Sequence, residues 1–209
     1  MRGLYALKPW YSRRLTAITR AAVRRQLSPD LFTTAGVLAA AGGAVAIWRG
    51  WWVAAVVLLA VRLAGANLDG AIARARAVSR PRGFVINELG DRASDLLMFA
   101  GLAALAARTA GPESRGWLVA GVAATALAAS LPTFVSLCAA GCGAPRANGG
   151  PVGKTERCAL AAVATAVPAL LAGLGVLIAA GSVLTAGLRL RQALRELATT
   201  TPSELAMAA

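Results

Sequence analysis

The chain has 209 residues, of which 57% are hydrophobic and 15% are charged, and it contains no histidine. A soluble domain carries about 25% charged residues, and apolar runs of about 20 residues recur along this sequence, which indicates an integral membrane protein. The net charge of +13 is spread between the apolar runs, so anionic membrane lipids and phosphate-bearing substrates are expected as partners, and nucleic acid is not. With three cysteines and no histidine, neither a disulfide framework nor a zinc site is expected.

Residues 1–30 are predicted to form a separate N-terminal segment that lies on the membrane surface. Basic residues alternate there with apolar ones, and Trp10 and Tyr11 are side chains that favour the membrane interface. This pattern is typical of a basic amphipathic helix, and a disordered basic tail is the alternative. Ser28-Pro29-Asp30 then begins a new helix, because proline fits the first turn of a helix.

Residues 31–197 are predicted to form one membrane domain, followed by a C-terminal tail at 198–209. Four apolar runs are each long enough for one spanning helix, and they cover residues 31–47, 51–74, 84–107 and 116–139. A further apolar stretch, residues 158–195, is too long for one helix and is expected to contain two, joined near Ala172-Gly173. The predicted fold class is therefore all-α, with six transmembrane helices preceded by the amphipathic interfacial helix.

The distribution of positive charge predicts the orientation. Of the 22 basic residues, 17 lie in the terminal segments and in the loops on the same side, 3 lie on the opposite side and 2 lie within helices. Lysine and arginine are enriched on the cytoplasmic side of membrane proteins. The bias therefore predicts a multi-pass protein of the cytoplasmic (inner) membrane with both termini in the cytoplasm, and the even helix count agrees with it.

An acidic stretch, residues 67–95, separates two of the apolar runs, and it contains Asp69, Glu88, Asp91 and Asp95. Acidic side chains beside apolar runs of membrane length are costly, which points to a function. Asn87, Asp91 and Asp95 are spaced four residues apart, so they share one face of a helix. Neighbouring carboxylates in apolar surroundings need a cation between them, and oxygen ligands suit Mg²⁺, Mn²⁺ or Ca²⁺. The alternative is a salt bridge between helix ends, for example Asp69 with Arg92.

Small and basic residues in the same stretch predict a phosphate site beside the acidic one. Gly70 and Ala73 keep the surface of the helix low, so that a bulky ligand can approach the backbone. Arg74 can reach a phosphate from the same helix. Gly83 would let the N-terminus of the next helix come close to an anion, which that end of a helix favours. The site is expected at the cytoplasmic edge of the membrane.

The stretch resembles the signature of the CDP-alcohol phosphotransferases, also called CDP-alcohol phosphatidyltransferases, which reads Asp-x2-Asp-Gly-x2-Ala-Arg-x8-Gly-x3-Asp-x3-Asp. Six of its eight fixed positions are present at the right spacing: Asp69, Gly70, Ala73, Arg74, Gly83 and Asp91. Residues 27–30 are similar to the start of the family's first helix, and residues 153–157 to its loop before the fifth helix. The resemblance covers most of the chain and implies the six-helix architecture and a cytoplasmic site.

Two signature positions differ. The first aspartate falls on Ala66 and the third on Asn87. In the family these two positions belong to a two-metal site. Alanine cannot bind a metal, whereas asparagine offers a neutral amide oxygen. Neighbouring residues are candidate substitutes: Asn67 beside Ala66, Glu88 beside Asn87, and Asp95 one turn further on. A site with fewer negative charges would hold one divalent ion firmly, and the second weakly or not at all.

The resemblance implies a reaction. CDP-diacylglycerol and an alcohol acceptor would react in the presence of one or two Mg²⁺ or Mn²⁺ ions to give a phosphodiester lipid and CMP, as in phospholipid biosynthesis. It implies metal ligands at Asp69, Asn87, Glu88 and Asp91, with Asp91 as the general base. It implies nucleotide and diphosphate contacts at Asp69, Gly70, Ala73, Arg74 and Gly83. A homodimer is also implied, and the glycine-rich and alanine-rich helices would permit one.

Three basic residues near the fifth helix, Arg146, Lys154 and Arg157, are candidates for binding a phosphate of the acceptor or of a lipid. Ordinary anchoring of the cytoplasmic side by positive charge is the alternative for these residues. For the whole protein, the substitutions at Ala66 and Asn87 leave a second possibility open, a catalytically impaired relative that binds CDP-lipid as a regulatory or assembly subunit. A small transporter is a third possibility, but the charges gather at one membrane face and not at the midplane.

Overall fold

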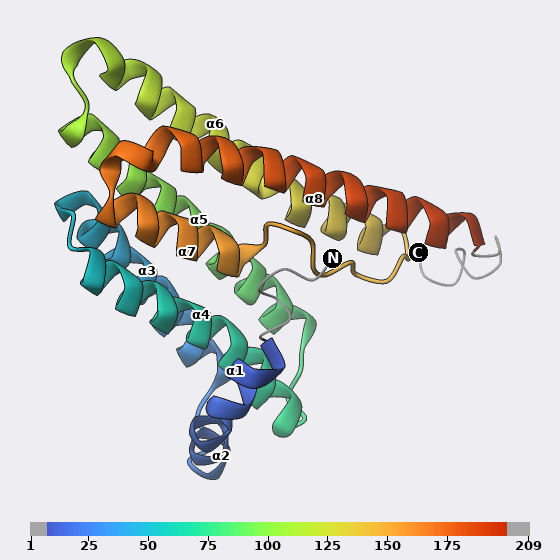
Figure 1. The fold of residues 1–209 in the computed structure, drawn as a ribbon. Coiled ribbons are helices and arrows are strands. Elements are labelled where there is room, and N and C mark those ends of the chain that lie inside the picture. Colours follow the sequence, from blue (N-terminus) through green and yellow to red (C-terminus); the bar gives the residue numbers. More distant parts are fainter. Residues whose placement is uncertain (1–7, 200–209) are drawn as a thin grey trace.

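The structure is a computed structural model that describes residues 8–199, and in that range it contains helices and no strand (Figure 1). The helices are α1 (Lys8–Arg14), α2 (Thr16–Arg24), α3 (Pro29–Arg49), α4 (Trp52–Ala75), α5 (Pro81–Thr109), α6 (Pro112–Gly141), α7 (Lys154–Ala166), the 3₁₀ turn η2 (Pro168–Leu170) and α8 (Leu171–Thr199). Most of the predicted C-terminal tail and the first seven residues of the predicted N-terminal segment lie outside the described residues.

Four helices are long and apolar enough to cross a membrane: Pro29–Arg49, Trp52–Ala75, Pro112–Gly141 and Pro168–Ala198. The expectation of an all-helical membrane protein is confirmed at this level. Within the described residues, two of the six predicted spanning helices, α5 and α7, do not meet the same criterion of length and apolarity. The first half of α5 carries Arg82, Glu88, Asp91, Arg92 and Asp95, and α7 has 13 residues.

The helix ends follow local sequence signals. The hydroxyl of Ser28 accepts a hydrogen bond from the backbone N–H of Asp30 at the start of α3, and Pro29 occupies the first turn. At the other end of α3, Gly50 has a φ of 76°, a conformation that glycine adopts without strain. Prolines also begin α5 and α6. Because α4 ends at Ala75 and α5 begins at Pro81, the turn between them is short, and the end of α4 lies near the start of α5.

The boundary between the last two helices differs from the prediction. The chain breaks at Val167 and Pro168, a few residues before the predicted junction at Ala172-Gly173, and α8 runs through that pair without interruption. Proline lacks the N–H that would continue α7, so the break falls there. In addition, residues 154–157 belong to α7, where a loop was expected. The glycine-rich loop is therefore limited to residues 142–153.

The packing of α3 against its neighbours depends on small residues. A Cβ on Gly65 of α4 would lie 2.6 Å from the carbonyl oxygen of Phe32, and a Cβ on Gly101 of α5 would lie 2.7 Å from that of Ala44. Helix α7 packs against α4 and α5, and α8 runs beside α6 (Figure 1). As a result the end of α4 and the starts of α3, α5 and α7 meet at the same end of the bundle.

The N-terminal segment forms the short helices α1 and α2 beside that end. Ala22 of α2 is buried against Leu68 and Ile72 of α4. The guanidinium of Arg76, just after α4, donates hydrogen bonds to the carbonyl oxygen of Leu27 at 2.5 Å and to the side-chain oxygen of Gln26 at 2.9 Å. These contacts attach α2 to the membrane domain, next to the acidic stretch.

Candidate functional site

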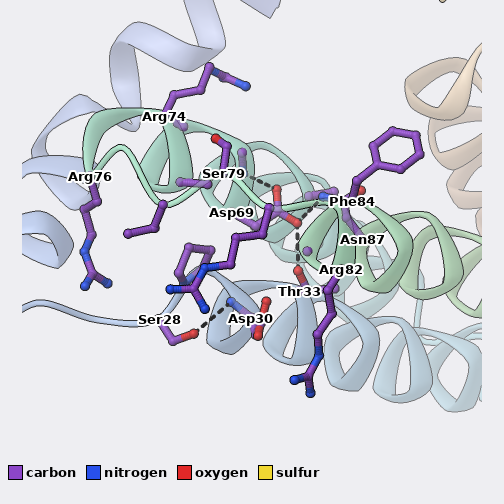
Figure 2. Close-up of a pocket in the computed structure, with 18 of the residues that line it drawn as sticks. Ser28, Asp30, Thr33, Asp69, Arg74, Arg76, Ser79, Arg82, Phe84 and Asn87 are labelled. Atoms are coloured by element: carbon purple, nitrogen blue, oxygen red, sulfur yellow. Dashed lines mark hydrogen bonds between the residues drawn. The ribbon is translucent and has the colours of Figure 1, made fainter. Parts of the chain in front are cut away.

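A cavity of about 760 Å³ opens where α3 begins, α4 ends and α5 begins (Figure 2). All five signature residues predicted to contact the nucleotide line it: Asp69, Gly70, Ala73, Arg74 and Gly83. The start of α3 contributes Asp30 and Thr33, and the loop after α6 contributes Arg146. A cavity of this volume is in the range of sites that hold a cofactor-sized ligand.

Asp69 lies in the wall of this cavity, and the groups that donate hydrogen bonds to its carboxylate are neutral. Its Oδ2 accepts hydrogen bonds from the Thr33 hydroxyl at 2.8 Å and from the side-chain amide of Asn87, as Figure 2 shows. Its Oδ1 accepts one from the backbone N–H of Gly70. No arginine or lysine among residues 8–199 forms an ion pair with Asp69, so the predicted alternative of a salt bridge to Arg92 is not formed. The charge of Asp69 thus stays available to a bound cation.

The three predicted basic residues each meet an acidic residue of α5. Arg146 Nη2 lies 2.5 Å from Glu88 Oε1, Lys154 Nζ lies 2.5 Å from Asp91 Oδ2, and Arg157 Nη2 lies 2.7 Å from Asp95 Oδ2. The pairs of Glu88 and Asp91 are partly exposed at the site, whereas that of Asp95 is buried. The structure therefore brings together the residues predicted from the fifth helix and those of the acidic stretch.

Asp95 belongs to a buried network below the site. Its Oδ1 accepts a hydrogen bond from Arg62, its Oδ2 accepts one from Arg157, and Arg92 lies 3.1 Å away. Neither cavity that touches Asp69 is lined by Asp95. Asp95 is thus occupied by arginines and does not replace a missing metal ligand. The role of Arg62 could not be foreseen, because an arginine within an apolar run shows no partner in the sequence.

The arginines around the cavity fall into two kinds. The structure gives no hydrogen bond or ion pair to Arg74, Arg80 or Arg82 within the described range, whereas Arg76 is bound to the turn before α3. Three unpaired guanidinium groups beside a cavity are suited to bind an anion with more than one phosphate. Arg80 and Arg82 were predicted as part of the cytoplasmic positive charge and not as site residues; their place directly before Gly83 was the available signal.

The two small residues of the signature leave the cavity wall open. A Cβ on Gly83 would meet no protein atom within 4 Å, and a Cβ on Gly70 would lie 3.2 Å from Arg74 Nη1. A side chain at either position would therefore fill cavity space or displace the guanidinium. Room for a ligand at Gly70, and an anion close to the N-terminus of α5 at Gly83, remain predictions.

The position of Ala66 leaves a second, smaller cavity of about 10 Å³, enough for one water or ion. Asp69 and Asp91 both line it, together with Thr33, Gly36, Arg62, Ala66, Gly90 and Ser94. The proposed substitutes do not line it. The side chain of Asn67 donates a hydrogen bond to the carbonyl oxygen of Leu63, and that of Glu88 binds Arg146.

The oxygen groups around Asp69 could hold one divalent ion only with further ligands from water or substrate. No three Asp, Glu, Cys or His side chains of the described residues are grouped closely enough to hold a metal by themselves. The candidate oxygen ligands are the carboxylate of Asp69, the carboxylate of Asp91, which is bound to Lys154 here, and the amide of Asn87, which lines the larger cavity. Mg²⁺ is commonly bound through one or two carboxylates together with water and substrate phosphate.

The sequence profile of the CDP-alcohol phosphatidyltransferase family matches residues 26–189, and the chain belongs to this family. The phosphatidylinositol phosphate synthase of Mycolicibacterium smegmatis is 41% identical to it over 88 residues, which are 41% of this chain and 39% of that protein. The matched part thus spans well under half the length of that relative.

Crystal structures of the phosphatidylinositol phosphate synthase PgsA1 of Mycobacterium tuberculosis have the same fold. The structure with CDP-DAG bound is 26% identical, with a TM-score of 0.69 over 91% of this chain and 96% of that one. The complex with manganese and citrate is 27% identical, with a TM-score of 0.71 over 90% of each chain. Both alignments extend beyond the acidic stretch to nearly the whole bundle.

Proposed function

We propose that this protein is a membrane transferase that moves a phosphatidyl group from CDP-diacylglycerol to an alcohol acceptor and releases CMP, as a step of phospholipid biosynthesis. One observation carries the proposal: the cavity at the end of α4 combines Asp69 with three unpaired arginines, Arg74, Arg80 and Arg82. A carboxylate for a cation next to guanidinium groups for phosphates is the arrangement that a nucleoside diphosphate needs.

In this proposal the diphosphate lies against Gly70 and Gly83, with Arg74 beside it. Asp69, Asp91 and the amide oxygen of Asn87 would hold one Mg²⁺ or Mn²⁺, with Glu88 nearby but bound to Arg146. When bound, the ion neutralises negative charge that develops on the diphosphate. The manganese found with the M. tuberculosis protein supports the choice of metal.

Asp91 is the proposed general base. Its carboxylate accepts the proton of the acceptor hydroxyl, whose oxygen forms a bond to the β-phosphorus of the donor, while the bond between this phosphorus and the oxygen of CMP breaks. Arg146 and Lys154, with side chains 31% and 27% exposed, are the cations that a phosphate of the acceptor or of a lipid can reach. Arg157 is 3% exposed and would act through Asp95.

We further propose that residues 31–197 form six membrane-spanning helices in the cytoplasmic membrane, with both termini and the site on the cytoplasmic side. The bias of positive charge and the alternating direction of the helices support this topology. α2, held to α4 through Ala22, would lie along the surface among anionic lipids. The protein would act as a homodimer.

The proposal is tested by release of CMP. Purified protein in detergent is given CDP-diacylglycerol, Mn²⁺ and a panel of alcohols with and without phosphate, and CMP is measured by chromatography. Wild type should turn over with at least one acceptor, and Asp91→Asn should lower turnover by at least about 100-fold because the base is lost. The control is Glu113→Gln, in the first turn of α6 far from the site. Equal, slow release by wild type and Asp91→Asn with every acceptor would refute the proposal.

A second candidate function is favoured by Ala66 and Asn87. These residues leave fewer charges for a metal, so the protein would bind CDP-lipid as a regulatory or assembly subunit without turnover. Tight, metal-dependent binding of CDP-diacylglycerol by a protein that releases no CMP would support this alternative. Introducing aspartate at both positions should then create turnover.

A further inference from the structure

A buried cluster of charges lies one helical turn below the site. The carboxylate of Asp95 binds Arg62 through one oxygen and Arg157 through the other, and the Arg62 side chain is 1% exposed. The second nitrogen of the Arg62 guanidinium donates a hydrogen bond to the thiol sulfur of Cys158 at 3.1 Å. Arg62 of α4 therefore touches α5 through Asp95 and α7 through Cys158.

Each of the three helices that this cluster joins also carries a residue at the site. Asp91 lies one turn before Asp95 on α5, and Lys154 lies one turn before Arg157 on α7. The pair of Lys154 and Asp91 at the site thus stands directly next to the pair of Arg157 and Asp95 in the interior. Arg62 joins the buried pair of Arg157 and Asp95 from α4, where it lies two turns before Asp69.

Helices α4 and α5 need such a link. They are connected by the short loop 76–80, yet they make few direct contacts, because α3 and α7 lie against both of them (Figure 1). Buried charge pairs cost desolvation energy and are weak evidence of stabilisation by themselves. Removal of one partner, in contrast, changes the charge balance of a buried cluster in which Asp95 faces Arg62, Arg92 and Arg157, and breaking such a cluster is strongly destabilising.

We propose that Arg62 is a positioning residue: by holding Asp95 and, through it, Arg157, it sets α7 against α5 so that Lys154 meets Asp91. The assignment of turnover to this pair rests on the proposed function, but the positioning itself does not. Arg62 also lines the small cavity beside Asp69 and Asp91, and it does not line the larger cavity of about 760 Å³.

The chain offers a direct readout of this positioning. It contains two lysines, Lys8 and Lys154. The Lys154 side chain is 27% exposed, so a water-soluble acetylating reagent can reach its amine, and the ion pair with Asp91 should slow the reaction. The rate of Lys154 acetylation, followed by mass spectrometry and normalised to Lys8, therefore reports whether the pair is formed. Asp91→Asn is the reference for a released Lys154.

Arg62→Met should raise the acetylation rate of Lys154 by at least about tenfold, towards that of Asp91→Asn, because Asp95 loses one of its arginine partners and α7 loses the contact between Arg62 and Cys158. Arg62→Lys keeps a cation for Asp95 and should stay within about twofold of wild type. Leu105→Ala is the matched control, since Leu105 is a fully buried residue of α5 away from the cluster; it should lower the melting temperature without releasing Lys154. Arg157→Met removes the ion pair between Arg157 of α7 and Asp95 of α5, so it should also raise the acetylation rate of Lys154. This variant replaces Arg62→Met if Arg62→Met does not fold.

Acetylation of Lys154 in Arg62→Met, or in Arg157→Met in its place, at the rate of Leu105→Ala would overturn the proposal. Turnover gives a second measurement. Arg62→Met should lower kcat for CMP release by about 10- to 100-fold while KM for CDP-diacylglycerol stays within about twofold, because the nucleotide cavity is lined by other residues. A change in KM alone would also contradict a positioning role. If wild type releases no CMP, the proposed function fails, and the acetylation rates alone decide the role of Arg62.

Discussion

Asn87 shows how a single residue changes the charge of the site. Its amide donates a hydrogen bond to Asp69, so the two side chains attract each other in the absence of a metal. A carboxylate at position 87 would instead repel Asp69, and only a cation or a proton would relieve that repulsion. The site of this protein is thus expected to be formed before the metal binds.

Asn87→Asp should make stability depend on the metal. Without metal we expect the melting temperature to fall by about 5 °C, because a hydrogen bond becomes a repulsion, and with Mn²⁺ we expect most of this loss to be recovered. Thermal unfolding with EDTA and with Mn²⁺ measures both values. Asn67→Asp is the matched control, since the amide of Asn67 binds Leu63 of its own helix and not Asp69. A fall of equal size with and without Mn²⁺ would contradict this account.

The sequence was sufficient to predict which residues of α4 and α5 line the cavity, but not which side chains pair with the acidic residues of α5. Asp69, Gly70, Arg74 and Gly83 follow a fixed spacing on neighbouring helices, so their common cavity could be predicted. The pairing of Lys154 with Asp91 depends on how the 142–153 loop returns to the site, and no local pattern encodes that path. Arg189 of α8 donates hydrogen bonds to the carbonyl oxygen of Gly149 in this loop and to that of Pro132 in α6. These two bonds hold the loop against α6 and α8.

At the scale of the elements, the contact between α3 and α4 brings Thr33 to Asp69. The two helices approach where Gly65 faces Gly36, and a Cβ on Gly65 would lie 3.0 Å from the Cα of Gly36 as well as 2.6 Å from the oxygen of Phe32. Glycine is needed here for close packing of two backbones and not for its conformational freedom. The hydrogen bond between Thr33 and Asp69 depends on this distance.

Gly65→Ala should therefore destabilise the protein, by about 1–3 kcal/mol, because the helices must move apart. It should also weaken CDP-diacylglycerol binding, since Asp69 loses its contact with α3. Gly121→Ala is the control: it changes a glycine inside α6 at which a Cβ meets no atom within 4 Å, so it should be neutral or stabilising by up to about 1 kcal/mol. Denaturation curves of both variants, with binding measured by calorimetry, provide the test. Equal stability of the two variants would show that the crossing tolerates a methyl group.

Helix ends could be predicted at Pro29 and Gly50, where proline or glycine marks them, whereas α5 begins at Pro81, three residues before the predicted start at Phe84. The start of α7 was missed because Gly153-Lys154-Thr155 reads as a continuation of the glycine-rich loop. The structure explains the difference through Glu156, whose carboxylate accepts a hydrogen bond from the N–H of Gly153 at 2.9 Å and thereby caps the first turn. A glutamate three residues after the loop was the available signal.

For the whole molecule, the proposed topology makes the two ends of α6 face opposite sides of the membrane. Cys138 and Cys142 are exposed near its end, on the side of the site, whereas Cys158 is buried. We expect a membrane-impermeant maleimide to label wild type in inverted vesicles and not in intact spheroplasts. Ser114→Cys, combined with Cys138→Ser and Cys142→Ser, moves the thiol to the start of α6 and should reverse the pattern. Labelling of wild type from the outside would contradict a cytoplasmic site.

The short length of α7 has a consequence for how substrates arrive. A helix of 13 residues is about 20 Å long, whereas the hydrocarbon core of a bilayer is about 30 Å thick. Helices α6 and α8 continue past the start of α7 (Figure 1), where Lys154 is the first helical residue. Under the proposed topology, a donor with two acyl chains would reach the start of α7 from within the lipid phase, while a water-soluble acceptor would come from the cytoplasm. The two reactants would then meet below the level of the membrane surface, so the lipid donor would not have to leave the bilayer to react.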